Sequence, residues 1–149
     1  MRGVAPAPRP LPGVRAVLDH YRDRDDTVLA LLTGNYGPSA RLKLEPLGLW
    51  DYFQCGAFGD DAPDRNGLVP IAIARAQACG HASVDTRWAV VIGDTPHDVR
   101  CAAAHGVRSL GVATGGCAID VLRDAGADEV LPDLSDTPRV VAILDALSR

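Results

Sequence analysis

Residues 88–100 read WAVVIGDTPHDVR, and this stretch decides the fold class. Its first five residues form an uninterrupted apolar run, which is typical of a parallel strand buried on both faces. Gly93 and Asp94 end the run, and Thr95 follows as a residue whose hydroxyl can cap the start of a helix. Pro96 suits the first position of that helix. The stretch therefore predicts a strand that runs directly into a helix.

The same alternation of strands and helices extends over most of the chain. Apolar runs predict strands, and apolar residues at helical spacing predict helices. The expected helices are 13–24, 39–47, 68–79, 96–105, 118–124 and 139–147, and the expected strands are 27–32, 52–58, 88–92, 109–112 and 129–131. Alternating elements with short turns imply right-handed β-α-β units and a parallel sheet with helices on both faces. We therefore expect a three-layer α/β/α doubly wound fold, in which ligands bind at the carboxyl ends of the strands.

The composition is that of one globular domain. The chain has 149 residues, of which 47% are hydrophobic and 23% charged, and this favours a single buried core. We expect a Pro-rich lead over residues 1–12 and a core domain over residues 13–149. The net charge of −4 leaves no surplus of basic residues for a phosphate backbone, so nucleic acid is not an expected partner.

Cysteine use and hydropathy indicate the compartment. The four cysteines are too sparse for a disulfide scaffold and are interpreted as small core residues. No apolar run approaches the roughly 18 residues of a membrane span, and the Pro-rich start lacks the apolar region of a signal peptide. We therefore expect a cytoplasmic protein with no membrane partner.

Two of the expected strands end in residues that suit a phosphate and a cation. Thr33, Gly34 and Asn35 offer a hydroxyl donor and accessible backbone N–H groups, which suit an oxyanion such as phosphate, although this triplet also forms ordinary turns. Asp94 and Asp98 lie four residues apart at a helix start, so both carboxylates can face the same rim of the sheet. They suit Mg²⁺, which takes one or two protein carboxylates together with water and phosphate, and they also suit helix capping.

Three segments carry a resemblance to a known family. LLTGN (31–35), ARLKLEPLGLWDYF (40–53) and VVIGDTPHDVRCAAAHGV (90–107) resemble, in order and spacing, motifs II, III and IV of the haloacid dehalogenase (HAD) superfamily. The match is closest to its phosphoglycolate-phosphatase-like branch and covers almost everything after residue 11. The resemblance implies Mg²⁺-dependent hydrolysis of a small phosphorylated substrate through an aspartyl-phosphate.

The resemblance also implies the role of each matched residue. Thr33 and Asn35 contact the transferring phosphoryl group, and Lys43 neutralises that group and the nucleophile. Asp94 is then a ligand of Mg²⁺, and Asp98 supports the metal site. These roles agree with the chemistry of phosphoryl transfer, which needs positioning and charge neutralisation more than covalent help from the protein.

Lys43 is the only lysine of the chain, but two other interpretations stay open. A lysine early in a helix is usually solvated surface. Arg65 is a rival, because some relatives place the motif III cation in a loop after the third strand, like residues 60–65 here. Asp60 and Asp61 begin that loop, where they can help at the rim of the site or simply end the strand.

The nucleophile of the resembled family has no counterpart among the expected strand ends. Family members attack with an Asp of an Asp-x-Asp-x-Thr/Val motif at the end of the first strand, and no strand is expected before Leu11. The literal match, Asp23-Arg-Asp25-Asp-Thr27, precedes the 27–32 strand. At ~3.3 Å per residue it lies about 20 Å from Thr33, whereas attack on phosphorus needs about 3 to 3.5 Å. We interpret it as a charged turn between a helix and a strand.

The unassigned first strand has a structural consequence. In the resembled fold that strand lies between the strands bearing Thr33 and Asp94, so its absence opens the sheet and leaves two unpaired edges. We therefore expect a truncated core, without the cap insertion, that is inactive alone. The alternative is a non-catalytic module that binds a phosphorylated ligand or pairs through its open sheet, either as a homo-oligomer or with a complementary N-terminal segment.

Overall fold

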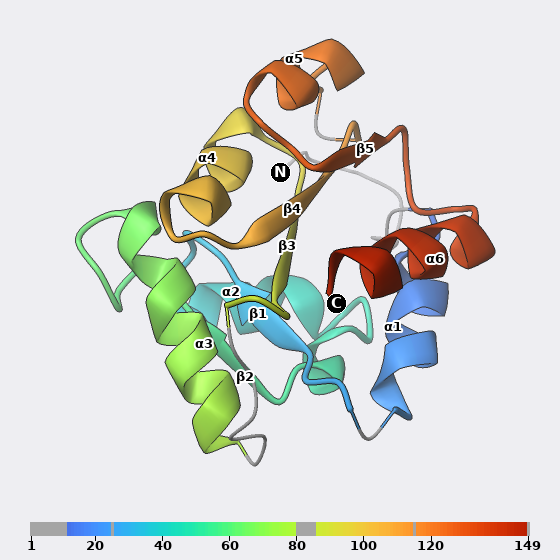
Figure 1. The fold of residues 1–149 in the computed structure, drawn as a ribbon. Coiled ribbons are helices and arrows are strands. Elements are labelled where there is room, and N and C mark those ends of the chain that lie inside the picture. Colours follow the sequence, from blue (N-terminus) through green and yellow to red (C-terminus); the bar gives the residue numbers. More distant parts are fainter. Residues whose placement is uncertain (1–11, 25, 80–85, 115, 149) are drawn as a thin grey trace, which may run out of the picture.

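The computed structural model describes residues 12–24, 26–79, 86–114 and 116–148, so the expected lead over 1–12 lies almost entirely outside the described residues. The helices are α1 (Val14–Arg22), α2 (Gly37–Leu44), α3 (Leu68–Ala78), α4 (Pro96–Ala104), α5 (Ile119–Asp124) and α6 (Thr137–Leu147), with short 3₁₀ turns η1 (Trp50–Tyr52) and η2 (Arg65–Gly67). The strands are β1 (Ala30–Leu32), β2 (Cys55–Ala57), β3 (Val90–Gly93), β4 (Arg108–Val112) and β5 (Glu129–Leu131). These elements follow the expected order, and the fold is the α/β type predicted from the sequence (Figure 1).

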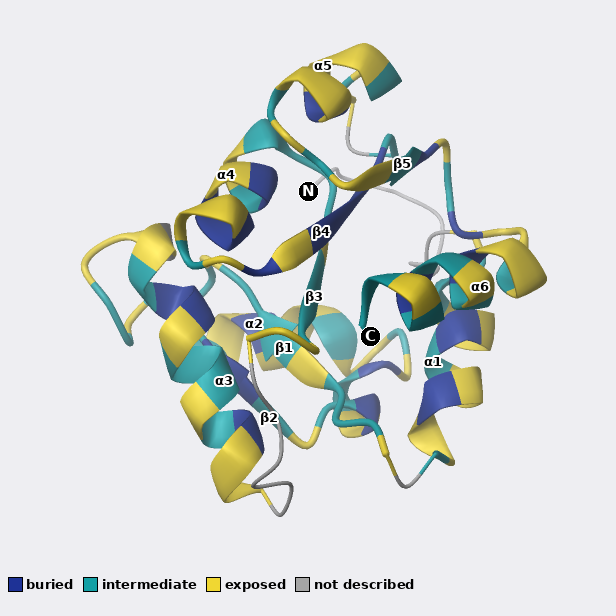
Figure 2. Cartoon of the chain, in the orientation of Figure 1, coloured by how far each residue is buried: buried dark blue, intermediate teal, exposed yellow. Residues whose placement is uncertain are grey.

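The strands form two parallel sheets. Strand β1 pairs with β2, while β3, β4 and β5 pair in that order. Helices α3 and α4 cover one face of the strands, and α1 and α6 cover the other (Figure 1). Each of these helices contains at least two buried residues. Buried segments alternate with less buried ones along α1, α3 and α4 (Figure 2). The layers are therefore those of a doubly wound α/β/α fold.

Side-chain packing places β1 and β3 in the same layer. Leu29, just before β1, packs with Val90 of β3 on the cluster formed by α1, β4, β5 and α6. Leu32 of β1 packs with Val91 of β3 on the cluster formed by α3, α4 and Val107. Yet no backbone pairing joins β1 to β3 among the described residues. The sheet is divided at this point, as the sequence predicts.

The first two strands are shorter than expected, for a local reason. The ladder of β1 begins at Ala30: the Leu29 carbonyl still accepts from the Gln54 backbone N–H at 3.0 Å, but the Leu29 N–H donates to the side-chain Oε1 of Gln54 at 3.3 Å. Residues 50–52, part of which was expected in a strand, form the 3₁₀ turn η1. Strand β5 covers residues 129–131, as predicted.

The cysteines depart partly from expectation. All four are free thiols, but only Cys101 is buried, whereas Cys79 is exposed and the other two are half-buried. Burial raises the pKa of Cys55 to about 11, and its hydrogen bond with Cys79 adds to the shift. The interpretation as core residues therefore holds for Cys101 alone.

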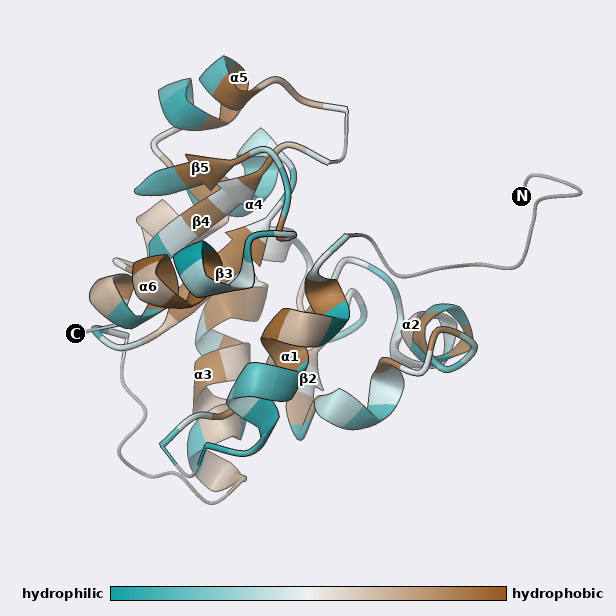
Figure 3. Ribbon diagram, turned by 90° about the vertical axis from the view of Figure 1, so that its right-hand side faces the viewer, coloured by the Kyte–Doolittle hydropathy of each residue, from teal (hydrophilic) through white to brown (hydrophobic). Residues whose placement is uncertain are grey.

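Hydropathy differs from strand to strand, and β5 is partly hydrophilic (Figure 3). Strand β3 is coloured hydrophobic throughout most of its length (Figure 3). No helix in the described ranges has both the length and the apolar character needed to cross a membrane.

Candidate functional site

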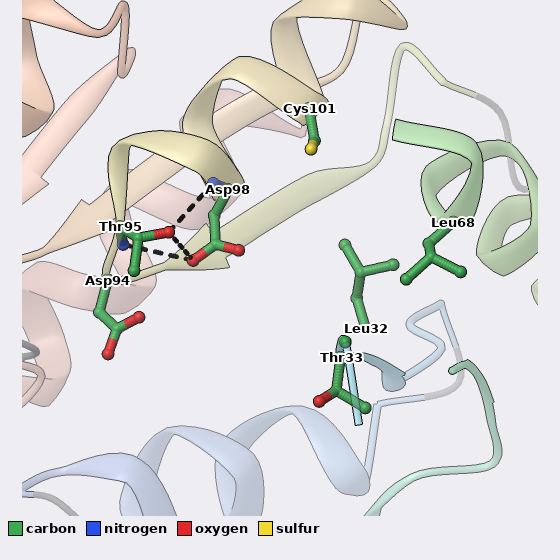
Figure 4. A pocket seen from close by; sticks show the side chains of 8 residues that line it. Leu32, Thr33, Leu68, Asp94, Thr95, Asp98 and Cys101 are labelled. Atoms are coloured by element: carbon green, nitrogen blue, oxygen red, sulfur yellow. Dashed lines mark hydrogen bonds between the residues drawn. The ribbon is translucent and has the colours of Figure 1, made fainter. Parts of the chain in front are cut away.

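A cavity of about 190 Å³ lies at the carboxyl ends of β1 and β3, where the sheet is divided. It has room for several water molecules at about 30 Å³ each. It is lined by Leu32, Thr33, Gly34, Leu68, Asp94, Thr95, Asp98 and Cys101. Thr33 lies on one side of the cavity and Asp94 on the other (Figure 4). Two of the strand ends singled out from the sequence therefore meet at one site.

Thr33, Asn35 and Lys43 form one hydrogen-bonded chain. The Asn35 backbone N–H and its side-chain Nδ2 both donate to Thr33 Oγ1, each at 3.1 Å. Lys43 Nζ donates to Asn35 Oδ1 at 3.2 Å. The lysine side chain is exposed, as the surface interpretation requires, but it also reaches the turn after β1. The Thr33–Asn35 turn and helix α2 are thus linked by side chains.

The two bonds accepted by Thr33 decide what its hydroxyl can do. A hydroxyl oxygen has two acceptor positions and one hydrogen to donate. Asn35 occupies both acceptor positions, so the Thr33 O–H hydrogen remains for an acceptor in the cavity. An oxygen of a bound anion is such an acceptor.

A close backbone approach supports the turn from the side of β2. The Gly59 N–H donates to the Asn35 carbonyl at 2.8 Å. A Cβ on Gly59 would lie 2.0 Å from the Gly34 carbonyl oxygen, so only glycine fits here. The loop after β2 and the turn after β1 therefore hold each other in place.

Asp94 and Asp98 come from the first turn after β3. Asp98 forms a capping box with Thr95, because the Asp98 N–H donates to Thr95 Oγ1 at 3.2 Å and the Thr95 N–H donates to Asp98 Oδ2 at 3.3 Å. The capping interpretation of Asp98 is thus confirmed. Among the described residues, none donates a hydrogen bond to the Asp94 carboxylate, which lines the cavity. Asp94 is therefore available to a cation.

The donor set fits Mg²⁺. Mg²⁺ prefers oxygen ligands and binds through one or two carboxylates, with water and phosphate completing its shell. Asp94 and Asp98 supply two carboxylates on the same cavity wall. No cluster of three or more His, Cys, Asp or Glu that could hold a metal is found in the described part of the chain. The site fits a metal shared with an anionic ligand rather than a protein cage.

The polar groups of the cavity differ from wall to wall. Thr33 brings a hydroxyl to one wall, while Asp94 and Asp98 bring carboxylates to the other. Asn35 and Lys43, which are bonded to Thr33 and to each other, are not among the lining residues. A bare anion would be repelled by the carboxylates, and a bare cation would leave the hydroxyl unused. The arrangement suits an anion and a cation bound together.

The other candidate site residues predicted from the sequence do not line the cavity or lie outside the described residues. Asp60 is exposed, and Asp61 pairs with Arg75, which lowers the pKa of the Asp61 carboxyl. Arg65 begins η2, but its side chain lies outside the described residues. Asp23 caps the C-terminal end of α1, and the connection that follows it enters β1 at the end opposite to Thr33. Asp25, the second Asp of the literal match, lies outside the described residues.

Arg75 is the residue that the sequence analysis missed. It connects β2 with the loop that follows it, by bonds to the Gly56 carbonyl in β2 and to Asp61 in the loop. It is also the only charged residue of α3, which reads LVPIAIARAQA. A single charge in a helix that packs against β1 and β2 is the signal that could have found it, because a partly buried charge needs a partner.

Comparison with known proteins relates the chain to one group. The model of the HAD-hydrolase-like family matches residues 69–137, which include β3 and the capping box of α4. None of the curated proteins matches the chain in sequence.

Solved structures share the fold. A protein assigned as a β-phosphoglucomutase from Thermotoga maritima is 25% identical, with a TM-score of 0.76 over 91% of this chain and 61% of its own. A predicted phosphatase from Clostridium acetobutylicum is 21% identical, with a TM-score of 0.74 over 88% of this chain and 59% of its own. A haloacid dehalogenase-like protein from Agrobacterium tumefaciens is 23% identical, with a TM-score of 0.72 over 92% of this chain and 62% of its own. The chain thus spans about 60% of the length of the structures it resembles.

Proposed function

This chain is a relative of the HAD-like hydrolases, and from that premise we propose that it is the core of a Mg²⁺-dependent phosphomonoester hydrolase. Within that family we propose the phosphoglycolate-phosphatase-like branch, with a small phosphorylated molecule as the substrate. The free thiols of the four cysteines suit the cytoplasm, where we place the protein.

The Thr33 hydroxyl, whose residue lines the cavity, is the observation that carries this proposal. Asn35 fills both of its acceptor positions, so its hydrogen is left for an acceptor in the cavity. A pre-oriented donor costs no reorganisation when charge develops on the transferring group. Thr33 would donate to a phosphoryl oxygen, with Gly34 and Asn35 shaping the turn around it.

Lys43 and a Mg²⁺ ion held by the two carboxylates would neutralise the charge of the substrate. One N–H of Lys43 bonds Asn35, and its other two hydrogens are available to a phosphoryl oxygen. Asp94 would hold Mg²⁺ directly, and Asp98, which also caps α4, would support it. Bound Mg²⁺ would neutralise charge on the phosphoryl oxygens.

The attacking group is proposed to come from outside the described residues. Apart from Asp94 and Asp98, no described carboxylate lines the cavity. Both of these serve the metal in the proposed site. We therefore propose that an Asp-bearing strand enters the opening between β1 and β3, and that the 149-residue chain alone does not turn over substrate.

Hydrolysis of p-nitrophenyl phosphate tests this function. The 149-residue chain with Mg²⁺ is expected to show no turnover, whereas the protein extended upstream in its reading frame is expected to be active. In the extended protein, Asp94→Asn should abolish activity because the metal loses a charged ligand. The control, Asp120→Asn, changes an exposed carboxylate on α5 and should leave activity unchanged.

Two results would contradict the proposal. Clear turnover by the 149-residue chain would refute the external nucleophile. If the extended protein is active and its Asp94→Asn variant keeps full activity, Asp94 is not a ligand of the metal.

A second candidate function is favoured by the divided sheet. Among the described residues, β1 and β3 each have one edge without a partner strand, and Ile92 in β3 is 43% exposed. Unpaired apolar strand edges are templates for pairing with another chain. The chain would then be a non-catalytic module that pairs with a second copy or with a complementary segment.

A further inference from the structure

We propose that Arg75 is a positioning residue for the phosphate-binding turn Thr33–Asn35, and that it acts through Asp61 and the loop after β2. This inference rests on the proposed function, because it concerns the same turn. Arg75 lies on helix α3, belongs to none of the sequence motifs and does not line the cavity.

Arg75 makes three hydrogen bonds, one to strand β2 and two to the loop that follows it. Its Nη1 donates to the Gly56 carbonyl at 2.8 Å and to Asp61 Oδ2 at 2.7 Å. Its Nη2 donates to Asp61 Oδ1 at 2.9 Å. The guanidinium and the carboxylate are therefore paired through two parallel bonds, which is the strong and directional form of this interaction.

Asp61 closes the loop on itself. Its Oδ2 also accepts a hydrogen bond from the Phe58 N–H at 2.8 Å, and its own N–H donates to the Phe58 carbonyl at 2.9 Å. The Asp61 side chain is only 21% exposed, so it is partly shielded from water. Residues 58–61 thus form a closed loop that Arg75 fastens to α3.

The closed loop bears directly on the turn after β1. The Gly59 N–H donates to the Asn35 carbonyl, and Gly59 lies against the Gly34 carbonyl with no space for a Cβ. The side chain of Asn35 in turn orients the Thr33 hydroxyl and bonds Lys43. A continuous set of bonds therefore leads from Arg75 to the two groups proposed to hold the phosphoryl oxygens.

An ordinary surface ion pair would not have this effect. Exposed pairs contribute little, and Arg75 is itself 43% exposed in its side chain. The bond to the Gly56 carbonyl is what sets this pair apart, because it ties the guanidinium to β2 and to the loop that follows β2. A lysine has no planar fork and cannot make the three bonds in this geometry.

The test compares Arg75→Gln, Asp61→Asn and the double variant with the unaltered chain. The matched control is Arg123→Gln, which removes an exposed arginine that pairs with Asp120 on α5 at 3.5 Å. Two quantities are measured: the binding of inorganic phosphate in the presence of Mg²⁺, by calorimetry, and the hydrogen exchange rate of the Gly59 amide, by NMR. Exchange of the buried α4 amides reports whether the fold is intact.

Each single variant is expected to weaken phosphate binding by about tenfold and to speed Gly59 exchange by a similar factor, with α4 exchange unchanged. The double variant should bind phosphate no more weakly than either single variant, because each single substitution already removes the ion pair between Arg75 and Asp61. Arg75→Lys should restore only part of the binding, and Arg123→Gln should match the unaltered chain.

The inference and the proposed function fail in different ways. If the unaltered chain binds phosphate and Arg75→Gln binds it equally well, the inference is overturned and the function stands. If the unaltered chain does not bind phosphate, the proposed function is overturned, and the Gly59 exchange rate then decides the inference. Unchanged exchange in Arg75→Gln would show that Arg75 does not hold this loop, whereas faster exchange would support it.

Discussion

Gly93 has no side chain, and this allows the end of β3 to lie close to the first turn of α4. A Cβ on Gly93 would lie 2.4 Å from the Asp98 Cβ, which is too close for two carbon atoms. Because Asp98 is fixed by its capping box, the strand end and the helix start would have to separate. Gly93 therefore keeps Asp94 and Asp98 on one wall of the cavity.

Gly93→Ala is expected to lower the free energy of unfolding by about 1 to 3 kcal/mol, as for overpacking in a well-packed site. Binding of Mg²⁺, measured by calorimetry, should be lost at the same time. Gly37→Ala is the control, because its Cβ would make only an ordinary contact of 3.9 Å with the Phe58 ring. Equal stability and Mg²⁺ binding in Gly93→Ala and the unaltered chain would contradict this account.

The residues of the candidate site differ in how far their position can be predicted from the sequence. Thr33, Asp94 and Asp98 follow apolar strands, and the carboxyl ends of parallel strands meet at one edge, so their common cavity follows from position in the chain. The link from Lys43 to Asn35 depends on the packing of α2, which no local pattern encodes. Arg75 pairs with a residue 14 positions away in a loop, so only the tertiary structure reveals its partner.

At the scale of elements, the start of α4 has the strongest local determinants in the chain. Thr95 precedes Pro96, and its hydroxyl both accepts from the Asp98 N–H and donates to Asp98 Oδ2 at 2.9 Å. A capping box satisfies two N–H groups that a helix start otherwise leaves unpaired. This explains why the strand-to-helix junction is predicted correctly from the sequence.

Thr95→Val keeps the shape of the side chain and removes the hydroxyl. The expected loss is about 1 kcal/mol in the free energy of unfolding, as for other N-cap residues, measured by urea denaturation. Thr137→Val is the matched control, since Thr137 begins α6 but the cap there is the side chain of Asp136. Thr95→Ser should keep most of the stability. If the Thr95→Val protein is as stable as the control, the capping box does not contribute to the free energy of unfolding.

The elements around β1 and β2 are less predictable. Their apolar runs are longer than the strands, because side chains and a 3₁₀ turn take over the backbone groups at their ends. In the described ranges, β1 also has only β2 as a neighbour, and no strand there extends its ladder on the other edge. The type of each element follows from local sequence, but the length of a strand depends on its partners.

At the scale of the whole molecule, the edges of β1 and β3 that have no partner strand in the described part of the chain predict self-association of the 149-residue chain. Ile92→Lys places a charge on the edge strand β3 and should reduce association, because charged side chains block edge pairing. Val121→Lys is the control: Val121 is 46% exposed, close to the 43% of Ile92, but lies on α5. Analytical ultracentrifugation over a range of protein concentrations measures the difference. A chain that stays monomeric throughout, or equal effects of both variants, would contradict pairing through β3.

The division of the sheet also makes the proposed catalytic cleft a seam between two lobes, one built on β1 and β2 and the other on β3, β4 and β5. Across this seam the lobes are joined by packed side chains and not by strand pairing in the described residues. A strand or ligand that occupies the seam would complete the cleft and would bind only the folded state. Its occupancy can then be followed by the melting temperature of the protein, without any assay of chemistry.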